Sequence, residues 1–461
     1  MTSATNATSR LGKFVARCRK EVFPPVVADK AAACLLDAIG LGILAHDERT
    51  SSAMRALLVP VRSGKMIARV WADGMPVAVS EAVTANAFAV HAQFHDDCLN
   101  VSAAHPGSLI VPVAVSLAEA LDRCLDDVLR AIVAGYATLH FLGAGERVAK
   151  AMIYRGIRTS PTLGPIGAAA AAAVVLGLDE GRATNAVAMA ASITGGLLEP
   201  VRAGSDEWRM QNAHAARGGL LAAQLAEKDV EGAPDALEGA KGLLRVMAGM
   251  NEPLPEWSVD PKIDAILEAW AKPWATLGDN VAAVAAAKLL HESGVNTARI
   301  RRITVRICRL HAEYPGTSFK GPYVRVTQAI ASTLFATAAM LVYGHLEYEI
   351  SLEHRNDARI LRLVGLTTVE ADDAYTEFDA SVELELDDGS KLARTASDSP
   401  KVLLYHDRKT SSDLFEARLA SGGMPAGTGR DVAGMIYDSM DRSQRISMRL
   451  LLDRIVQGCP R

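Results

Sequence analysis

Apolar residues recur at helical spacing through the first 265 residues of the chain. Between residues 27 and 46 they fall three or four positions apart, which predicts a helix with one apolar face. These positions are Ala31, Leu35, Leu36, Ile39 and Ile43. The run GAAAAAAVVL at 167–176 is followed by Gly177 and Asp179, residue types that end one helix and begin the next. A further helix is expected at 213–228. This part of the chain therefore predicts helices packed against helices.

The periodicity changes after the sequence Lys-Pro-Trp at 272–274. Apolar residues alternate with polar ones at 303–307 and again at 381–386, which is the pattern of strands with one buried face. Asp-Gly at 388–389 then provides a tight turn that reverses the chain. Helical spacing is present between these strands, and it returns in the last stretch, 410–457.

These changes of period predict a mainly α protein with two parts. A large all-helical domain would be formed by both ends of the chain, residues 1–266 and 405–461. A smaller α+β domain, residues 267–404, would be inserted between them and act as a lid. The change from helical to alternating periodicity near residue 300 is the basis for this division.

Composition narrows the class of protein. Alanine dominates while aromatic residues make up only 5% of the 461 residues, which favours closely packed helices. The net charge is −4 and no long basic run occurs, so we expect no nucleic-acid partner. The six cysteines lack CxxC spacing, which is typical of reduced thiols. We recognise no signal peptide and no uninterrupted apolar run of membrane-spanning length, so we expect a soluble, cytoplasmic protein with no membrane partner.

One stretch, residues 86–112, concentrates ionisable side chains between apolar flanks. It contains three histidines, two adjacent carboxylates and a thiol. These residues are His91, His95, His105, Asp96, Asp97 and Cys98. Ionisable groups held against apolar walls are the ones whose pKa values shift, as proton-transfer chemistry requires. We therefore expect the functional site to include this stretch.

Two of these histidines could hold a metal ion. His91 and His95 are four residues apart and share one face of a helix, with Asp96 alongside. The pattern lacks the glutamate of HExxH and a distant third ligand, so zinc is the weaker interpretation. We expect His91 to pack and form hydrogen bonds that order the end of its helix, and we expect no metal.

His105 is the strongest candidate for acid–base chemistry. Pro106 restricts the loop, and an imidazole titrates near neutral pH, so the side chain meets the requirements of a general acid or base. Asp96 and Asp97 have two open interpretations: a structural cap or arginine partner, or a catalytic carboxylate. Successive residues on a helix point about 100° apart, so at most one of the two would face a site.

The same stretch resembles the signature of the MmgE/PrpD superfamily. The matching residues are Asn86, His91, Asp96-Asp97 and His105-Pro106-Gly107-Ser108. This superfamily includes 2-methylcitrate dehydratase, cis-aconitate decarboxylase and an iminodisuccinate epimerase. The resemblance extends over almost the whole chain. It implies a helical domain with an inserted α+β domain, a homodimer formed through the helical domain, and a reaction without metal.

Three further segments match site segments of the superfamily. Arg158 lies in the segment 154–167, and Arg209 lies in a cluster after the loop at 204–206. Lys272 opens a Lys-Pro-aromatic sequence at the expected hinge between the two domains. From these matches we interpret three residues as catalytic candidates, namely His105, Lys272 and Asp97. The substrate-binding candidates are Arg158, Arg209, Cys98 and His91.

The chain departs from the superfamily pattern at four positions. Phe94 stands where the first aspartate of a three-acid run is usual, and Cys98 replaces a threonine. Arg158 replaces a histidine, and Trp208 stands about where the superfamily has a lysine. Because these changes remove polar groups, a reassigned specificity or another lyase or isomerase reaction is favoured over 2-methylcitrate dehydration.

The first hypothesis for the function is a lyase or isomerase that removes a proton next to a carboxylate of a small di- or tricarboxylate. The outcome would be dehydration, decarboxylation or epimerisation. His105 would move the proton, while Arg158 and Lys272 would converge with it in the cleft between the domains and stabilise the resulting dianion. No cofactor is expected, because GAGER at 143–147 lacks the third glycine and the preceding strand of a dinucleotide-binding fingerprint.

The second hypothesis is a catalytically inert member of the superfamily. Such a protein would bind a carboxylated ligand or serve only as a dimeric partner. The loss of acid–base groups at 94, 158 and 208 is the sequence feature that favours it.

Overall fold

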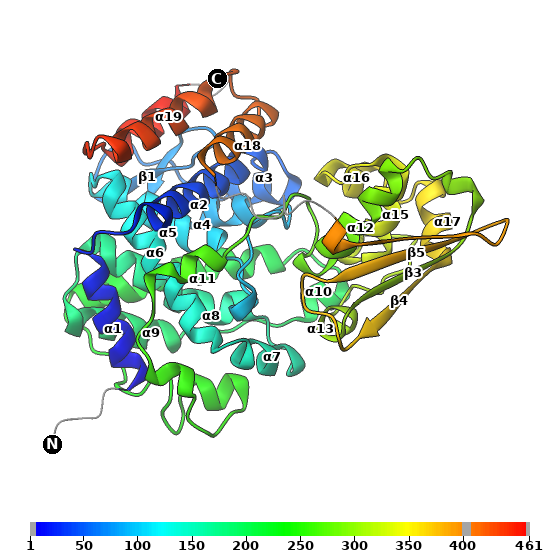
Figure 1. Cartoon of the computed structure of the whole chain (residues 1–461). Coiled ribbons are helices and arrows are strands. Elements are labelled where there is room, and N and C mark those ends of the chain that lie inside the picture. Colours follow the sequence, from blue (N-terminus) through cyan, green and yellow to red (C-terminus); the bar gives the residue numbers. More distant parts are fainter. Residues whose placement is uncertain (1–5, 399–406, 458–461) are drawn as a thin grey trace.

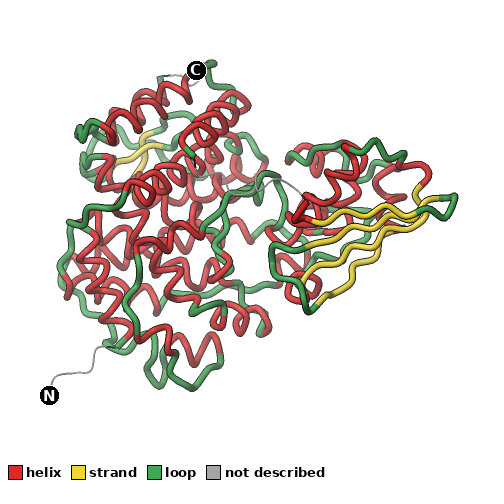
Figure 2. The backbone as a smooth tube through the Cα atoms, viewed as in Figure 1, coloured by secondary structure: helices red, strands yellow, loops and turns green. Residues whose placement is uncertain are grey.

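The computed structural model describes residues 6–398 and 407–457, which form a larger helical lobe and a smaller lobe with a sheet (Figure 1). The chain is mainly α-helical, as the sequence predicted (Figure 2). The helices of the larger lobe are α1 (Ala7–Cys18), α2 (Pro25–Leu44), α3 (Arg49–Arg55), α4 (Val79–His91), α5 (Pro106–Ala120), α6 (Leu125–Gly143), α7 (Arg147–Tyr154), α8 (Thr159–Leu176), α9 (Glu180–Ala191), α10 (Glu199–Ala203), α11 (Trp208–Glu227), α18 (Arg408–Ser421), α19 (Thr428–Asp441) and α20 (Met448–Val456).

Helix α8 is the centre of the larger lobe. It contacts α5, α6, α9 and α11, and its side chains are buried on all sides. Small residues allow this packing: a Cβ at Gly219 of α11 would lie 2.4 Å from the carbonyl oxygen of Pro165. α8 is long and apolar enough to span a membrane, as are α6 and α7 taken together, but 94% of the α8 window is buried inside the lobe. α8 is therefore placed as a core helix.

The C-terminal helices α18 to α20 pack back on the first part of the chain. α18 lies against α2, where Arg418 and Asp37 form a buried ion pair. Arg408 at the start of α18 bonds Asp29 at 2.8 Å and thereby joins the same two helices. Helices from both ends of the chain therefore contact one another, while the division into two domains stays a prediction. The expected boundary at 404/405 lies outside the described residues.

The smaller lobe consists of four strands and six helices among the described residues. Its helices are α12 (Val281–Glu292), α13 (Arg309–Glu313), α14 (Val326–Ala331), α15 (Thr333–Tyr343), α16 (Tyr348–Glu353) and α17 (Ala358–Leu366). Its strands are β3 (Ile300–Cys308), β4 (Thr367–Asp372), β5 (Ala380–Leu386) and β6 (Lys391–Thr395). The strand order is β4-β3-β5-β6, with β3 and β4 parallel and the other pairs antiparallel.

One face of this sheet is covered by α12, α15 and α17 (Figure 1). The alternating residues Val305 and Ile307 of β3 and Val382 and Leu384 of β5 are buried there. The two lobes have separate apolar cores, one formed within residues 7–269 and 415–455 and the other within 282–396. Movement of the smaller lobe as a lid stays a prediction.

One detail of the expected fold is wrong, because the larger lobe is not entirely helical. β1 (Ile67–Arg69) and β2 (Pro76–Ala78) form a two-stranded antiparallel ladder. Strands of three residues are too short to give a readable period, and tertiary contacts hold this one in place. The backbone N–H of Arg69 donates to Glu119 at 2.9 Å, and its carbonyl accepts from the Asn86 amide at 3.0 Å.

Candidate active site

The stretch that the sequence singled out forms the end of α4, a loop and the start of α5. His91 is the last residue of α4, and His105 is the N-cap of α5 with Pro106 in the first turn. The loop is tied to the hinge segment by two backbone hydrogen bonds between Cys98 and Trp270, of 2.8 and 2.9 Å. The rings of His91 and His105 consequently lie with their centroids 5.1 Å apart.

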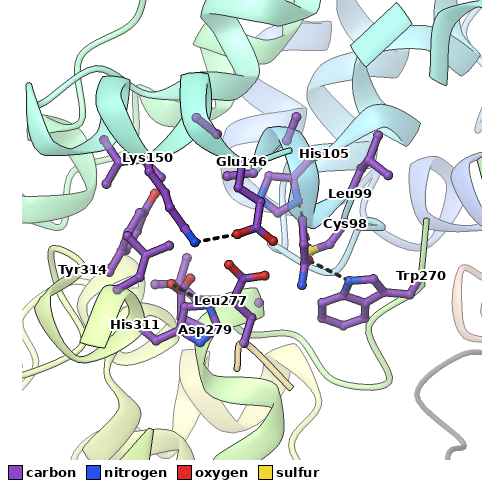
Figure 3. A pocket seen from close by; sticks show the side chains of 18 residues that line it. Cys98, Leu99, His105, Glu146, Lys150, Trp270, Leu277, Asp279, His311 and Tyr314 are labelled. Carbon is purple, nitrogen blue, oxygen red and sulfur yellow. Dashed lines mark hydrogen bonds and ion pairs between the residues drawn. The ribbon is translucent and has the colours of Figure 1, made fainter. Parts of the chain in front are cut away.

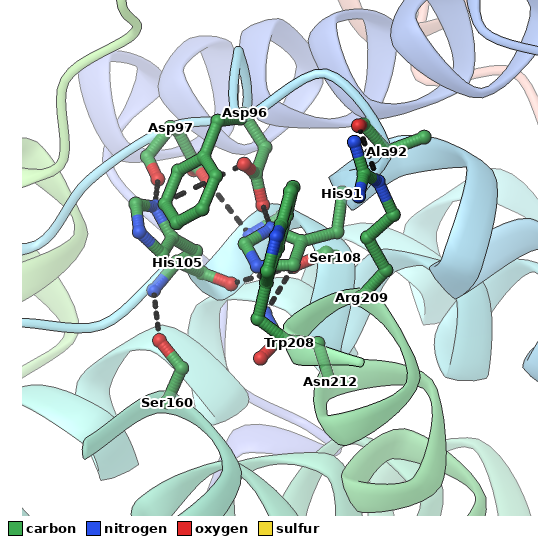
Figure 4. A network of polar contacts seen from close by, with 12 residues as sticks. His91, Ala92, Asp96, Asp97, His105, Ser108, Ser160, Trp208, Arg209 and Asn212 are labelled. Atoms are coloured by element: carbon green, nitrogen blue, oxygen red, sulfur yellow. Dashed lines mark hydrogen bonds and ion pairs between the residues drawn. The ribbon is translucent and has the colours of Figure 1, made fainter. Parts of the chain in front are cut away.

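His91 is fully buried, and both of its ring nitrogens are engaged (Figure 4). Nδ1 lies 2.8 Å from Asp96 Oδ2, and Nε2 lies 2.6 Å from Arg158 Nη2. A guanidinium can only donate, so Nε2 of His91 accepts from Arg158. Nδ1 therefore carries the proton and donates a hydrogen bond to Asp96 Oδ2. Burial, reinforced by the charge of Arg158, lowers the pKa of His91 well below its usual value. His91 is therefore a neutral link between Arg158 and Asp96, and it offers His95 no free nitrogen for a shared metal ion.

His105 has one ring nitrogen fixed by the backbone. Nδ1 lies 2.9 Å from the carbonyl oxygen of Asp97, and its own backbone N–H donates to Ser160 Oγ at 3.1 Å. Because a carbonyl can only accept, Nδ1 carries the proton and Nε2 presents a lone pair. Burial lowers the pKa of His105 well below its usual value, although Asp96 opposes this effect. The ring is therefore neutral near pH 7 and able to accept a proton at Nε2.

Cys98 lies beside His105, with Sγ 3.6 Å from Nδ1. This nitrogen already donates to the carbonyl of Asp97, so it cannot also take the thiol proton. Burial raises the pKa of the Cys98 thiol. Cys98 is consequently a neutral thiol and not a nucleophilic thiolate.

Asp96 is the carboxylate that faces the histidines. Its Oδ2 accepts from His91, and its Oδ1 lies 3.9 Å from His105 Nδ1. No hydrogen-bond partner for Oδ1 is found among the described residues, although the atom is buried.

Asp97 points the other way, toward α5 and α6. Its Oδ1 accepts from the backbone N–H of Gly107 at 2.7 Å, and its Oδ2 accepts from the hydroxyl of Tyr136 at 2.6 Å. Burial, followed by the nearby Asp37, raises the pKa of Asp97 to about 7. The two adjacent acids thus face different surroundings, although they lie in the loop after α4 and not on a helix as the expectation assumed. Asp97 holds the first turn of α5 that carries His105.

The three expected anion-binding side chains are buried and bonded to the protein itself. Arg158 Nη1 donates to Trp208 O at 2.9 Å and to Asn212 Oδ1 at 3.1 Å. Lys272 Nζ donates to the carbonyl oxygens of Phe94 and of Thr276, the latter at 3.1 Å. Within residues 6–398 and 407–457, neither cation forms an ion pair with a carboxylate.

Arg209 has the most complete set of internal partners. Its Nε donates to Ala92 O at 2.8 Å, and its Nη1 pairs with Asp206 at 2.8 Å. Its guanidinium also lies over the ring of Trp208, 4.1 Å from the centroid. Arg209 is therefore positioned as a structural residue behind the site.

Three of the four departures from the superfamily pattern contact one another. The rings of Phe94 and Trp208 have centroids 4.1 Å apart, and the edge of Trp208 packs against His91 at 4.9 Å. Arg158, the third changed residue, lies over the Phe94 ring at 5.7 Å and donates to the carbonyl of Trp208. An aromatic pair thus fills the space around His91 where the superfamily has charged groups.

A pocket lies between the two lobes, next to His105 (Figure 3). Its cavity volume is about 80 Å³, several times the roughly 10–15 Å³ that one water molecule requires. Its polar and aromatic lining consists of Cys98, Asn100, His105, Glu146, Lys150, Trp270, Asp279, His311, Tyr314 and Glu377. The pocket is therefore large enough for a small organic acid, and both lobes contribute to it.

Of the seven candidate site residues, the structure puts two on this pocket: Cys98 and His105. The others lie buried around them; they are His91, Asp97, Arg158, Arg209 and Lys272. The sequence alone did not indicate Asp279, His311 and Tyr314, which come from the smaller lobe. Asp279 follows the hinge and His311 follows strand β3. Their positions next to the hinge and at the end of an expected strand were the sequence features that could have marked them as pocket residues.

Comparison with known proteins agrees with this geometry. A profile of the MmgE/PrpD N-terminal domain matches residues 9–256, which include α2 to α11 of the larger lobe. The chain is also 25% identical over 421 residues to the cis-aconitate decarboxylase-like protein oryM of Aspergillus oryzae (strain ATCC 42149 / RIB 40). That similarity covers 84% of this chain and 85% of the fungal protein. With its His-Pro turn at the start of α5 and a profile match over more than half of its length, the chain belongs to the MmgE/PrpD family.

Proposed function

We propose that the protein is a lyase or isomerase that removes a proton next to a carboxylate of a small di- or tricarboxylate. The observation that carries this proposal is the state of His105. Its Nδ1 is committed to the carbonyl of Asp97, while the ring lines a pocket of substrate size. A neutral imidazole with a lone pair at Nε2 is the form that a general base requires.

The charge of the surroundings supports an anionic substrate. Arg158 and Lys272 are buried cations whose bonded partners are neutral groups. In the described part of the chain, neither cation bonds a carboxylate directly, although Asp96 acts on Arg158 through space. Burying a charge is costly, so an anion nearby would stabilise both cations. The positive charge of Lys272 acts on two groups of the pocket wall. It adds to the burial that lowers the pKa of His105, and it opposes the burial that raises the pKa of Cys98. In this proposal the two cations stabilise the dianion through their field and not by direct contact.

The experiment is a proton NMR screen in deuterated water. The probes are 2-methylcitrate, cis-aconitate and iminodisuccinate, which report elimination, decarboxylation and epimerisation by different spectra. His105→Asn should fold normally and lower turnover by about 10²–10⁴-fold, the contribution of a general base. His214→Asn, on the exposed side of α11, is the control and should keep the parent rate. Full activity of His105→Asn on any turned-over probe would reject this role.

The alternative function is an inert family member that binds a carboxylated ligand or acts as a dimeric partner. The specific observation in its favour is the Phe94–Trp208 ring contact, which occupies the space beside His91. This alternative expects a carboxylate to raise the melting temperature of the parent protein while no probe is converted. The NMR screen therefore separates the two functions.

A further inference from the structure

A second histidine lines the pocket from the other lobe. His311 lies on α13 directly after strand β3, and its Nε2 is 3.6 Å from Asp279 Oδ1. His105 and His311 lie on opposite sides of the pocket, one from each lobe (Figure 3). The proposed general base, His105, lies on the side of the pocket that the larger lobe forms.

The His311–Asp279 pair differs from an ordinary surface pair. The two side chains are 12% and 16% exposed. In the same lobe, the pair His345 and Glu347 has side chains that are 53% and 66% exposed, and it lines no pocket described here. A surface pair contributes little, whereas a carboxylate beside a mostly buried imidazole can fix the orientation of the ring. Asp279 is therefore placed to orient His311 in the pocket wall.

The other polar groups near His311 are consistent with this role. Glu377 also lines the pocket and interacts with His311, while Lys150 is paired with Glu146 at 2.5 Å. Burial raises the pKa of the Tyr314 hydroxyl, which therefore remains protonated. His311 is consequently the imidazole that the smaller lobe contributes to the described pocket wall, and an imidazole can donate as well as accept a proton in catalysis.

We propose that His311, oriented by Asp279, is the second catalytic residue of this pocket and delivers a proton to the substrate from the side opposite His105. This inference rests on the proposed function and adds the acid to the base. It favours reactions that need both groups on opposite faces, namely anti elimination and epimerisation. Decarboxylation forms its carbanion without a base.

The proton and electron balance is the same at the start of both reactions. His105 Nε2 takes the proton from the carbon next to the carboxylate, and the electron pair of the broken C–H bond is delocalised into that carboxylate. In an elimination, His311 protonates the leaving hydroxyl, the C–O bond breaks and water departs as the double bond forms. In an epimerisation, His311 instead protonates the same carbon on its other face. In either case His105 then loses a proton to solvent and His311 regains one.

The test measures two events separately in deuterated water: exchange of the substrate proton and formation of product. The probes are 2-methylcitrate and iminodisuccinate. His105→Asn should lose both events. His311→Asn should keep proton exchange within about threefold of the parent while product formation falls by about 10²–10⁴-fold. His345→Asn is the matched control, since it removes a histidine from a carboxylate pair outside the pocket, and both events should stay at the parent level.

Asp279→Asn tests the positioning role of the carboxylate. It should lower product formation relative to exchange in the same direction as His311→Asn but less strongly, whereas a merely structural role would lower both events together. If His311→Asn lacks a cooperative thermal unfolding transition, His311→Gln is measured in its place.

Product formation by His311→Asn within threefold of the parent overturns the inference and leaves the proposed function standing. The inference is also overturned if the parent protein exchanges the substrate proton but forms no product. A parent protein that exchanges no proton of either probe refutes both the second residue and the base from which it was derived.

Discussion

The pH dependence of stability should report directly on Asp97, the acid that holds the first turn of α5. Its carboxyl is buried, and its pKa is raised from 3.8 to about 7 mainly by that burial. The folded protein therefore binds this proton more tightly than the unfolded chain does. The stabilisation is fully present below about pH 4 and is lost as the pH rises to about 7.

The size of the effect follows from the pKa difference. A difference of about three pKa units at about 1.4 kcal/mol each gives a loss of about 4 kcal/mol between pH 4 and pH 7. In Asp97→Asn the side chain keeps its shape but does not titrate. Its amide oxygen can still accept from the backbone N–H of Gly107. The variant should therefore gain about 4 kcal/mol relative to the parent over this pH range.

The measurement is urea unfolding followed by circular dichroism at pH 4, 5, 6 and 7 for the parent and Asp97→Asn. Taking the difference between the two proteins removes the titration of every other group. Asp264→Asn, at an exposed position of the 3-10 helix Ile263–Glu268, is the control and should follow the parent at each pH. A difference between parent and Asp97→Asn that stays constant within about 1 kcal/mol would refute the reasoning, because one pKa unit already corresponds to about 1.4 kcal/mol.

Three further predictions concern packing and assembly. Gly107→Ala should lower the free energy of unfolding by about 1–3 kcal/mol in urea titrations, because the new Cβ would lie 2.7 Å from Asp97 Oδ1. A double-mutant cycle of Phe94→Ala and Trp208→Ala should give a coupling of about 0.5–1.5 kcal/mol from the contact between their rings, and strictly additive effects would contradict this contact. We also propose that the helical lobe forms a homodimer. Leu221→Asp, on the exposed apolar face of α11, should then halve the mass measured by light scattering, and a monomeric parent at micromolar concentration rejects the dimer.

Periodicity along the chain determined the main elements of the fold. The apolar spacing at 27–46 corresponds to α2, and the alternation at 303–307 and 381–386 corresponds to β3 and β5. These signals are local, since a buried face repeats every 3.6 residues in a helix and every second residue in a strand. The ladder of β1 and β2 gave no such signal because each strand has only three residues.

The sequence also determined the position of His105. The sequence predicted His105 in a loop restricted by Pro106, and in the structure His105 is the N-cap of α5 with Pro106 in the first turn. The family resemblance was likewise contained in the sequence and is confirmed by the profile match to residues 9–256. Local conformation and a contiguous motif are properties that neighbouring residues set among themselves.

Only the tertiary structure decided what the buried charges do. Arginine at 158 and lysine at 272 were expected to meet a substrate. Their donors instead face carbonyl and amide oxygens, most of which distant parts of the chain supply. The sequence also did not predict that Asp279 and His311 form a wall of the same pocket, because these residues lie more than 170 positions from His105. A hydrogen bond depends on a few tenths of an ångström and on direction, and packing between the lobes sets both. Residue types and spacing carry no such information. They indicated which stretch holds the ionisable side chains, but not which groups those side chains bond.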